Sequence, residues 1–407
     1  MLIANSQATH SSYPSHLQAI LSIEKGNISR EALQSWSLLD QAITPLVSLE
    51  GLSQALGLQS IHMKDESARS SLASFKVLGA PIALVQLIMR LWPEQPFNAQ
   101  ELLAGQYKHL LKDFVVISAT DGNHGRALAA AAQSIGCRCV IVIHAHVSTE
   151  REQAIAQFGA EIIRIQGNYD QSVIEAAQLA EKNKWWVVSD TSYTNYEEVP
   201  RDVMQGYAIM AQESLEQHTE YQSESMPISC PYSHVFLQGG VGGLAAGVIS
   251  HFWQVYGANR PFFISVEPNQ ADCILQSILH HLPTKTQGSG DSLMAGLACG
   301  EVSPLAWQFL KNTIDWALGI EDSAAEIAMR QLAQPIDHDK AIVSGESGAA
   351  GLAGLLEILK NPELAQLLQL NSGAKILLIN SEGATAPSVY QQIVGLDAKS
   401  VLSKNQY

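Results

Sequence analysis

The feature that most constrains this chain is a repeated alternation of short apolar runs with longer stretches rich in alanine and leucine. The apolar runs contain many β-branched residues and predict strands, whereas the stretches between them predict helices. Strands and helices that alternate at this spacing form parallel sheets with helices on both faces. Two runs, FVVIS at 114–118 and KILLIN at 375–380, are almost wholly apolar, as expected for strands buried on both faces.

The expected elements follow from these patterns. The predicted strands are 60–64, 114–118, 137–144, 161–165, 185–189, 234–238, 262–267 and 375–380. The predicted helices include 74–91, 125–135, 149–158, 171–183, 243–256 and 348–360. Two polar stretches, 213–233 and 282–292, predict surface loops.

Composition excludes several classes of protein. The chain has 407 residues, a length that favours two domains of roughly 100–200 residues each. Its formal net charge of −15 opposes binding to nucleic acid or to an anionic membrane. We find no apolar run long enough to span a bilayer and no secretory signal. The five cysteines are too few and odd in number for a disulfide framework, so we expect a cytoplasmic protein.

Lys76 is the first candidate for chemistry. It follows a hydroxyl-rich loop at 67–74 and precedes a largely apolar helix. An apolar surface lowers the pKa of a lysine, and a lysine that attacks a carbonyl group needs a lowered pKa. A lysine at the start of a helix is otherwise simply solvated, and the residues alone leave that alternative open.

Two turns that follow predicted strands could bind an anion. The turn TDGNHGR at 120–126 places backbone N–H groups and a helix N-terminus at the carboxyl edge of a sheet, where ligands bind in α/β folds. Asn123 could instead be the cap of that helix, and its position alone favours this. The turn GGVGG at 239–243 also leads from a strand into a helix and has the flexibility of a phosphate cradle.

The glycine-rich turn also supports a rival interpretation. Residues 240–245 fit the dinucleotide fingerprint G-x-G-x-x-A, and Glu267 ends the next strand. An NAD-dependent dehydrogenase is therefore an alternative, although it assigns no role to Lys76 or to the turn at 120–126.

Two serine-rich turns and one histidine pair complete the candidates. SGESG at 344–348 and SEGAT at 381–385 are either helix caps or, in the case of Ser381, a hydroxyl able to bond a neutral ring nitrogen. His144 and His146 share one face of a strand, but we identify no third ligand and expect no metal site.

Taken in order, these segments resemble the pyridoxal-phosphate enzymes of the tryptophan-synthase-β and threonine-dehydratase fold, called fold type II. Within that group the chain resembles the diaminopropionate ammonia-lyases. The motifs that carry the resemblance are KDES at 64–67, FK at 75–76, TDGNHGR at 120–126, NYD at 168–170, VEP at 266–268, ADC at 271–273, MAGLACGE at 294–301 and SGESG at 344–348.

The resemblance implies two open, mostly parallel twisted sheets with helices on both faces and pyridoxal phosphate in the cleft between two domains. The large domain would comprise 1–84 and 195–407, and the small domain 85–194. Lys76 would bind the cofactor covalently, Asn123 would bond its phenolic oxygen and Ser381 its pyridine nitrogen. The backbone of the glycine-rich turn would hold the phosphate, through Gly239, Gly240, Val241, Gly242 and Gly243.

The resemblance also implies a β-elimination that converts 2,3-diaminopropionate, in its D and L forms, to pyruvate and two molecules of ammonia. Lys76 would take the α-proton from one face and Asp121 from the other. Asp121 and Asp190 would favour the cationic β-amino group over a hydroxyl. Homodimers are common in this family, so we expect one.

Some residues depart from the family pattern. Ala384 and Ala386 stand where the ammonia-lyases usually carry carboxylates. A dehydratase or lyase acting on serine, threonine or a hydroxy-aspartate is therefore an alternative. A relative that only binds ligand is disfavoured, because Lys76, Asn123 and the phosphate loop are all present. Cys273 and Cys299 lie in two of the matched motifs, and a disulfide between them is disfavoured in a reducing compartment.

Overall fold

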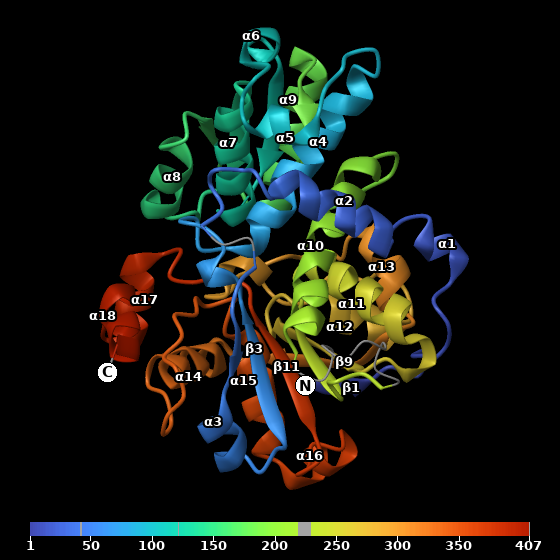
Figure 1. Cartoon of the computed structure of the whole chain (residues 1–407), viewed down its shortest axis with the longest axis vertical. Coiled ribbons are helices and arrows are strands. Elements are labelled where there is room, and N and C mark those ends of the chain that lie inside the picture. Colours follow the sequence, from blue (N-terminus) through green and yellow to red (C-terminus); the bar gives the residue numbers. More distant parts are fainter. Residues whose placement is uncertain (41–42, 121, 219–228, 407) are drawn as a thin grey trace.

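The computed structural model describes residues 1–40, 43–120, 122–218 and 229–406. Two sheets organise these residues, a larger one of seven strands in the order β1-β10-β9-β8-β11-β3-β2 and a smaller one of four in the order β6-β5-β4-β7 (Figure 1). The strands are β1 (Leu2–Ala4), β2 (Leu46–Ser48), β3 (Ser60–Asp65), β4 (Val115–Ala119), β5 (Arg138–Ile143), β6 (Glu161–Arg164), β7 (Trp186–Val187), β8 (His234–Gln238), β9 (Phe262–Pro268), β10 (Ile314–Ile320) and β11 (Lys375–Asn380).

Most neighbouring strands run parallel, as predicted. In the larger sheet only the two edges are antiparallel, where β1 pairs with β10 and β2 pairs with β3. The apolar runs form the interior strands, and every residue of β4 and of β8 is buried. The predicted α/β fold with open, mostly parallel sheets is therefore confirmed.

Helices cover both faces of the larger sheet because alternate residues of its strands supply two separate cores. Val235 and Leu237 of β8 belong to one hydrophobic cluster, and Phe236 between them belongs to another. The helices are α1 (Ser15–Gln18), α2 (Ile23–Leu33), α3 (Glu50–Ala55), α4 (Ala80–Leu91), α5 (Ala99–Leu103), α6 (Lys108–Leu111), α7 (Asn123–Ile135), α8 (Thr149–Ala156), α9 (Tyr169–Asn183), α10 (Glu198–Gln217), α11 (Gly243–Tyr256), α12 (Cys273–His280), α13 (Pro304–Leu310), α14 (Asp322–Ala333), α15 (Ala350–Leu359), α16 (Pro362–Leu367), α17 (Pro387–Val394) and α18 (Ala398–Ser403).

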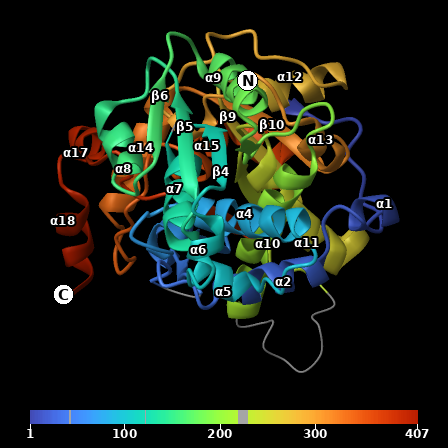
Figure 2. The same cartoon turned by 90° about the horizontal axis from the view of Figure 1, so that it is seen from above.

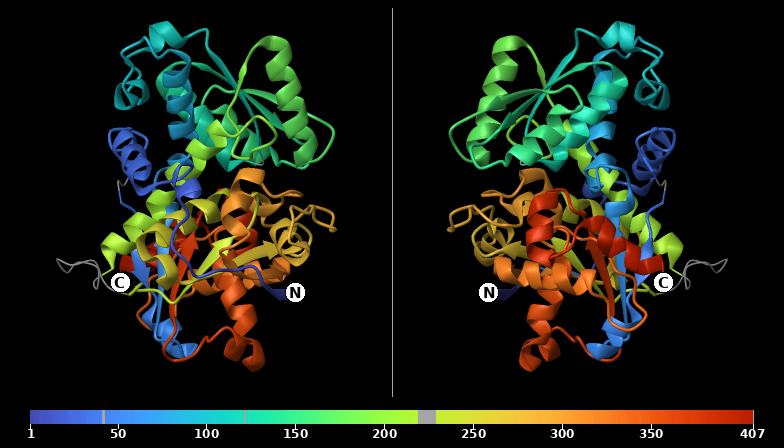
Figure 3. Two further views of the ribbon diagram at one scale, coloured as in Figure 1. Left: turned by 90° about the vertical axis from the view of Figure 1, so that its right-hand side faces the viewer. Right: turned by 90° about the vertical axis from the view of Figure 1, so that its left-hand side faces the viewer.

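The two sheets lie one above the other, each with its own helices (Figure 3). The smaller sheet, seen from above in Figure 2, takes all its strands from 115–187, and the larger sheet takes none from 85–194. The long helix α10 packs against α11 beside the larger sheet and against α4 beneath the smaller one. The domain limits 85–194 themselves stay a prediction.

Three strands and one long helix were not predicted. β1 and β2 have three residues each, too few for a periodic pattern, and β10 contains Asp315 within an otherwise apolar run. The predicted strand at 185–189 is only the two-residue strand β7. The loop predicted at 213–233 is wrong at its start, because α10 continues to Gln217 and buries Glu213 among charged partners. Residues 219–228 of that stretch lie outside the described part of the chain.

No helix in the described ranges is both long enough and apolar enough to cross a bilayer.

Candidate active site

A cavity open to solvent lies between the two sheets and receives the carboxyl ends of strands from both. This is the edge at which open parallel sheets bind ligands. Its lining brings together most of the candidate residues, with others from both halves of the molecule: Phe75, Lys76, Thr120, Gly122, Asn123, His124, Arg151, Tyr169, Asp190, Tyr207, Gln238, Gly240, Val241, Gly242, Gly243, Leu244, Gly296, Leu297, Cys299, Ser347, Ser381 and Glu382.

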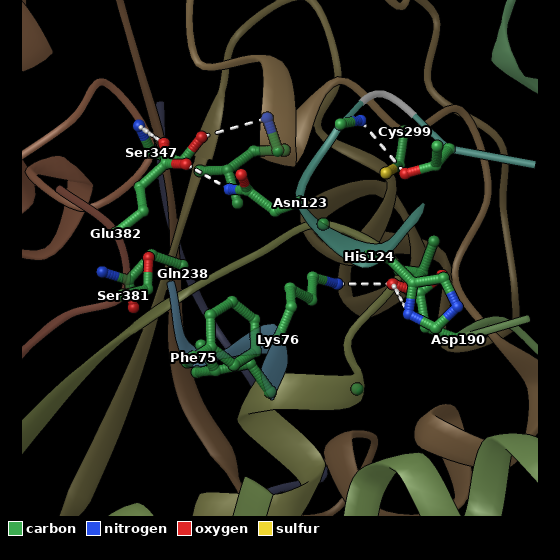
Figure 4. A pocket seen from close by; sticks show the side chains of 18 of the residues that line it. Phe75, Lys76, Asn123, His124, Asp190, Gln238, Cys299, Ser347, Ser381 and Glu382 are labelled. Carbon is green, nitrogen blue, oxygen red and sulfur yellow. Dashed lines mark hydrogen bonds and ion pairs between the residues drawn. The ribbon is translucent and has the colours of Figure 1, made fainter. Parts of the chain in front are cut away.

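Lys76 lies in a short 3-10 helix, Phe75–Leu78, just before α4. The Ser74 hydroxyl accepts a hydrogen bond from the Lys76 backbone N–H at 3.4 Å and so begins this turn. The Lys76 side chain extends past the Phe75 ring, with Nζ 5.0 Å from its centroid, and forms an ion pair with Asp190 (Figure 4). The Phe75 ring in turn packs against Tyr207, with 4.6 Å between centroids.

The expected lowering of the Lys76 pKa is wrong. Burial does disfavour the Lys76 ammonium, but the negative charge and hydrogen bond of Asp190 outweigh burial and raise the pKa above its usual value. The ion pair has the corresponding effect on the pKa of Asp190. Its burial favours the neutral acid, but the positive charge and the hydrogen bond of Lys76 lower its pKa to about 2. The sequence could not show this, because Asp190 is 114 residues further along the chain.

His124 completes this group, although sequence analysis gave it no role of its own. Its Nε2 lies 2.9 Å from the Val188 carbonyl oxygen, and its Nδ1 lies 3.8 Å from Asp190 Oδ2. Burial lowers the pKa of His124, so the ring is neutral near pH 7. Because a carbonyl oxygen only accepts, the single proton of the neutral ring lies on Nε2, and Nδ1 faces Asp190 without a hydrogen.

The turn after β4 is held by Thr120, whose hydroxyl accepts hydrogen bonds from Gly122 N at 3.0 Å and Gly125 N at 3.1 Å. Asn123 is the first residue of α7 rather than its cap, so the capping role favoured by its position is wrong. Its side chain instead crosses the cleft and donates a hydrogen bond to Glu382. Asp121 lies outside the described residues.

The glycine-rich turn connects β8 to α11 and forms one wall of the cavity. Gly242 has φ +94°, a conformation that favours glycine. A Cβ at Gly239 would lie 2.4 Å from Glu267 Cγ, and one at Gly240 would lie 3.2 Å from the Gly296 carbonyl oxygen. The first backbone N–H groups of α11 have no partner within the helix, so this turn fits a phosphate group.

Ser381 follows β11 directly and lies beside Gln238 in the cavity wall (Figure 4). It is 2% exposed, and its backbone oxygen accepts a hydrogen bond from Phe75 N at 3.0 Å. This bond ties the segment that carries Lys76 to the end of a central strand. The predicted cofactor residues thus supply a buried amine, an anion cradle and a hydroxyl in one cavity, a set that fits pyridoxal phosphate.

Arg151, Tyr207 and Gln238 line the cavity but lie in none of the candidate motifs, whereas Ser347 and Glu382 lie in the turns SGESG and SEGAT but received no role of their own. Glu382 could have been found, since it directly follows Ser381 at the end of an apolar strand. Tyr207 lies in the middle of α10, which was not predicted. Its hydroxyl is buried and has no hydrogen-bond partner among the described residues.

Other candidates lie away from the lining or make simpler contacts. Ala384 and Ala386 are not part of the cavity wall. Cys273 and Cys299 are not joined by a disulfide, and Cys273 Sγ lies 3.5 Å from the Gly240 carbonyl oxygen. Within the described ranges, no group of three or more histidine, cysteine, aspartate or glutamate side chains could hold a metal ion.

Comparison with known proteins gives matches over most of the chain. A family model for pyridoxal-phosphate dependent enzymes matches residues 38–382. Diaminopropionate ammonia-lyase from Salmonella typhimurium is 38% identical over 385 residues, which cover 92% of this chain and 94% of that protein. The protein of the same name from Escherichia coli K12 is 38% identical over 355 residues, 86% of this chain and 87% of that protein.

Solved structures give the same result. The crystal structure of Escherichia coli diaminopropionate ammonia lyase with an aminoacrylate-PLP azomethine reaction intermediate has a TM-score of 0.86 and 34% identity, covering 97% of this chain and 96% of that one. Threonine deaminase isoform 2 from Solanum lycopersicum shares the fold, with a TM-score of 0.70 and 20% identity over 97% of this chain and 98% of that one.

Proposed function

This chain belongs to the diaminopropionate ammonia-lyase family of pyridoxal-phosphate-dependent enzymes, and from that premise we propose that it converts 2,3-diaminopropionate to pyruvate and ammonia. One molecule of water is consumed, and two molecules of ammonia are released. The observation that carries the proposal is that the Lys76 amine and the glycine-rich anion cradle line one buried cavity.

Pyridoxal phosphate is the cofactor. We assign its covalent attachment to Lys76, its phosphate to Gly239, Gly240, Val241, Gly242 and Gly243, its phenolic oxygen to Asn123 and its ring nitrogen to Ser381. When bound, the cofactor supplies an electron sink for the negative charge that develops at the substrate Cα. A serine hydroxyl at the ring nitrogen leaves the ring largely unprotonated, which suits elimination better than transamination.

The proposed proton chemistry centres on Lys76. Its amine, once free, removes the α-proton of one enantiomer, and we assign removal of the α-proton of the opposite enantiomer to Asp121. Asp190 lies against the Lys76 amine and, as an ionised carboxylate, accepts a hydrogen bond from it and stabilises the protonated lysine. Neutral His124 lies beside Asp190, with Nδ1 3.8 Å from Asp190 Oδ2, and its Nε2–H donates to the Val188 carbonyl oxygen.

Substrate choice follows from charge. The carboxyl of Asp190 has a pKa of about 2 and is ionised at every pH at which the enzyme would work. A buried carboxylate favours the cationic β-amino group of diaminopropionate over the neutral hydroxyl of serine or threonine. The alternative substrates serine, threonine and hydroxy-aspartate were suggested by Ala384 and Ala386. These two residues do not line the cavity, so they give no support to that alternative. The family match excludes the NAD-dependent dehydrogenase.

The test is to assay pyruvate and ammonia from D- and L-2,3-diaminopropionate separately, with serine and threonine alongside. We expect two ammonia per pyruvate from both enantiomers and little turnover of the hydroxy-amino acids. Asp121→Asn should reduce the two enantiomeric activities unequally. No turnover of either enantiomer, by protein that carries the cofactor, would contradict the proposed substrate.

We also propose that the enzyme is a cytoplasmic homodimer. Five cysteines, few and odd in number, suit a reducing compartment, and the family commonly dimerises. Sedimentation equilibrium of the holoenzyme tests the dimer, which is contradicted by a molar mass equal to the chain mass of 44.0 kDa. We expect no nucleic-acid partner, because of the net charge of −15.

A further inference from the structure

A hydrogen bond between Asn123 and Glu382 crosses the cleft at the cavity. Glu382 follows Ser381 after the central strand β11, and Asn123 begins α7 beside the smaller sheet. The Asn123 side-chain amide donates to Glu382 Oε2, although the two residues are 259 positions apart (Figure 4). Glu382 is 2% exposed, so water does not compete for this bond.

The chemistry of this pair decides how the amide of Asn123 is oriented. An ionised carboxylate only accepts hydrogen bonds, so it binds the amide nitrogen and excludes the amide oxygen. The nitrogen carries two hydrogens, and Glu382 takes one of them. The other remains for an acceptor in the cavity that Asn123 lines.

Glu382 is surrounded by donors that favour its ionised form. Besides Asn123, the Ser347 backbone N–H donates to Oε1 at 3.1 Å and the Thr385 hydroxyl donates to Oε2 at 3.0 Å. Hydrogen bonds to the charged form of a carboxyl stabilise that form. The negative charge at this position is therefore held by three donors.

A second buried carboxyl, Glu346, differs from Glu382 in its surroundings. Glu346 Oε1 lies 3.4 Å from Arg151 Nη2, but Oε2 has no hydrogen-bond partner among the described residues. Burial and the negative charge of Glu382 raise the pKa of Glu346 to about 7, while Arg151 lowers it, with a small further increase from Glu150 on α8. Burial and the neighbouring charge therefore favour the neutral form of Glu346.

We propose that Glu382 is a positioning residue that orients the Asn123 amide so that its second N–H faces the cavity and binds the phenolic oxygen of pyridoxal phosphate. The inference rests on the proposed function, because that function assigns Asn123 to the cofactor. Glu382 acts through Asn123 and needs no contact with the cofactor itself.

The experiment is a double-mutant cycle on cofactor affinity. Apoprotein is prepared from the native chain, Glu382→Gln, Asn123→Ala and the double variant, and the Kd for pyridoxal phosphate is measured by equilibrium dialysis. Glutamine offers an amide that can donate as well as accept, so Asn123 is free to turn its oxygen to the cavity. We expect Glu382→Gln to weaken binding about ten- to hundredfold, the range for one hydrogen bond to a charged group.

The cycle separates positioning from a general structural effect. If Glu382 acts through Asn123, Glu382→Gln has no further effect in the Asn123→Ala background. The pH dependence of the visible absorption of the bound cofactor should also shift in Glu382→Gln. The control is Asp315→Asn, which removes a buried carboxylate on β10 that pairs with Arg260 at 2.8 Å, and it should leave Kd unchanged.

Two results would overturn the inference: a native Kd in Glu382→Gln, or equal weakening by Glu382→Gln with and without Asn123. Should Glu382→Gln fail to fold, Glu382→Asp replaces it in the same cycle. Aspartate keeps the carboxylate, but its side chain is one methylene group shorter, so the carboxylate lies further from Asn123. A native chain that fails to bind pyridoxal phosphate would instead overturn the proposed function, and this inference with it.

Discussion

At the scale of single residues, the site depends on charges that burial alone would neutralise. Lys76 and Asp190 are both buried or nearly so, and each keeps the other ionised. Removing two charges from water is costly unless they are paired and hydrogen-bonded. The pair therefore stores the Lys76 amine in its protonated form until a competing partner takes the place of Asp190.

Asp190→Asn should change cofactor uptake and turnover in opposite directions. Without the carboxylate, burial lowers the pKa of Lys76, so more of the amine is neutral and able to attack the cofactor aldehyde at a given pH. We expect the pH midpoint for pyridoxal-phosphate uptake by the apoprotein to move down and diaminopropionate turnover to fall at least about a hundredfold. Stopped-flow absorbance and steady-state assays measure the two effects.

Lys76→Ala should abolish covalent attachment of the cofactor. Turnover should fall by about a thousandfold or more, because the nucleophile and the proposed base are lost together. The measurement is the mass of the borohydride-reduced protein, which gains the cofactor only if a lysine imine exists. Lys182→Ala, on the exposed surface of α9, is the control. A cofactor adduct that survives in Lys76→Ala would refute the assignment.

At the scale of elements, the glycine-rich turn requires glycine because a Cβ at Gly239 or Gly242 would collide with neighbouring atoms. A Cβ at Gly242 would combine a left-handed backbone, φ +94°, with an approach of 2.7 Å to Leu310 Cδ1. Gly395, which ends α17, has φ +81° and open space where its Cβ would be. The two glycines thus share the backbone requirement and differ in packing.

Gly242→Ala should therefore cost more than Gly395→Ala. Both should lose about 1 kcal/mol of unfolding free energy to backbone strain. Gly242→Ala should lose more through the leucine contact and should also weaken cofactor binding, because the turn must shift. Urea unfolding and equilibrium dialysis test the pair, and equal stability losses with native cofactor affinity in both would contradict the assignment of this turn.

A buried cluster of charged side chains connects β3 to α10. Glu213 lies 2.5 Å from Lys64 and 2.8 Å from Arg69, and Arg69 lies 2.8 Å from Glu66. All four side chains are at most 1% exposed. The cluster balances two positive charges with two negative ones.

Glu213→Gln should destabilise the protein by about 3–5 kcal/mol, because it leaves one buried cation without a counter-charge. The control is Glu216→Gln, one turn further along α10, which removes an ion pair with Arg30. The Glu216 side chain is 37% exposed, so this change should lower the unfolding free energy by no more than about 1 kcal/mol. Urea unfolding of both variants checks the difference. A small effect at Glu213 would show that the cluster relaxes or admits water.

At the scale of the whole molecule, the cavity exists only because two sheets face one another. Lys76 and Ser381 come with the larger sheet, while Asn123 and His124 come with the smaller one. The hydrogen bond from Asn123 to Glu382 and the ion pair between Arg151 and Glu346 cross between these halves. The Glu150 carboxylate adds a third link by accepting from the Ser388 hydroxyl at 2.7 Å.

The Glu346 contact makes stability depend on pH. Its carboxyl has a pKa of about 7 in the folded protein against a usual value of 4.5, so the folded state keeps a proton that the unfolded state has lost. Stability is therefore lost as pH rises from 4.5 through 7, by about 3 kcal/mol in total. Glu346→Gln cannot lose that proton.

Urea unfolding from pH 5 to pH 8 measures this effect. Relative to Glu346→Gln, the native protein should lose stability across this range, and Glu357→Gln, at a surface pair with Lys360 on α15, should behave as the native protein does. A parallel pH dependence in the native protein and Glu346→Gln would contradict the assignment.

Much of this protein was determined by its sequence alone. Apolar runs buried on both faces impose a parallel sheet, so the strands at 60–65, 234–238 and 375–380 could be located within one residue. Glycine-rich turns after such strands predict an anion site, because only glycine allows the backbone to approach a phosphate. The order of the motifs then indicated the cofactor and the family.

Tertiary structure alone decided which side chains meet and which of them are charged. The pKa of Lys76 depends on Asp190, and the orientation of Asn123 depends on Glu382, and neither partner is near in sequence. Short edge strands such as β1 and β2 also form only because a neighbouring strand is present. Sequence patterns report local periodicity, whereas electrostatic interactions and edge pairing act between segments that only folding brings together.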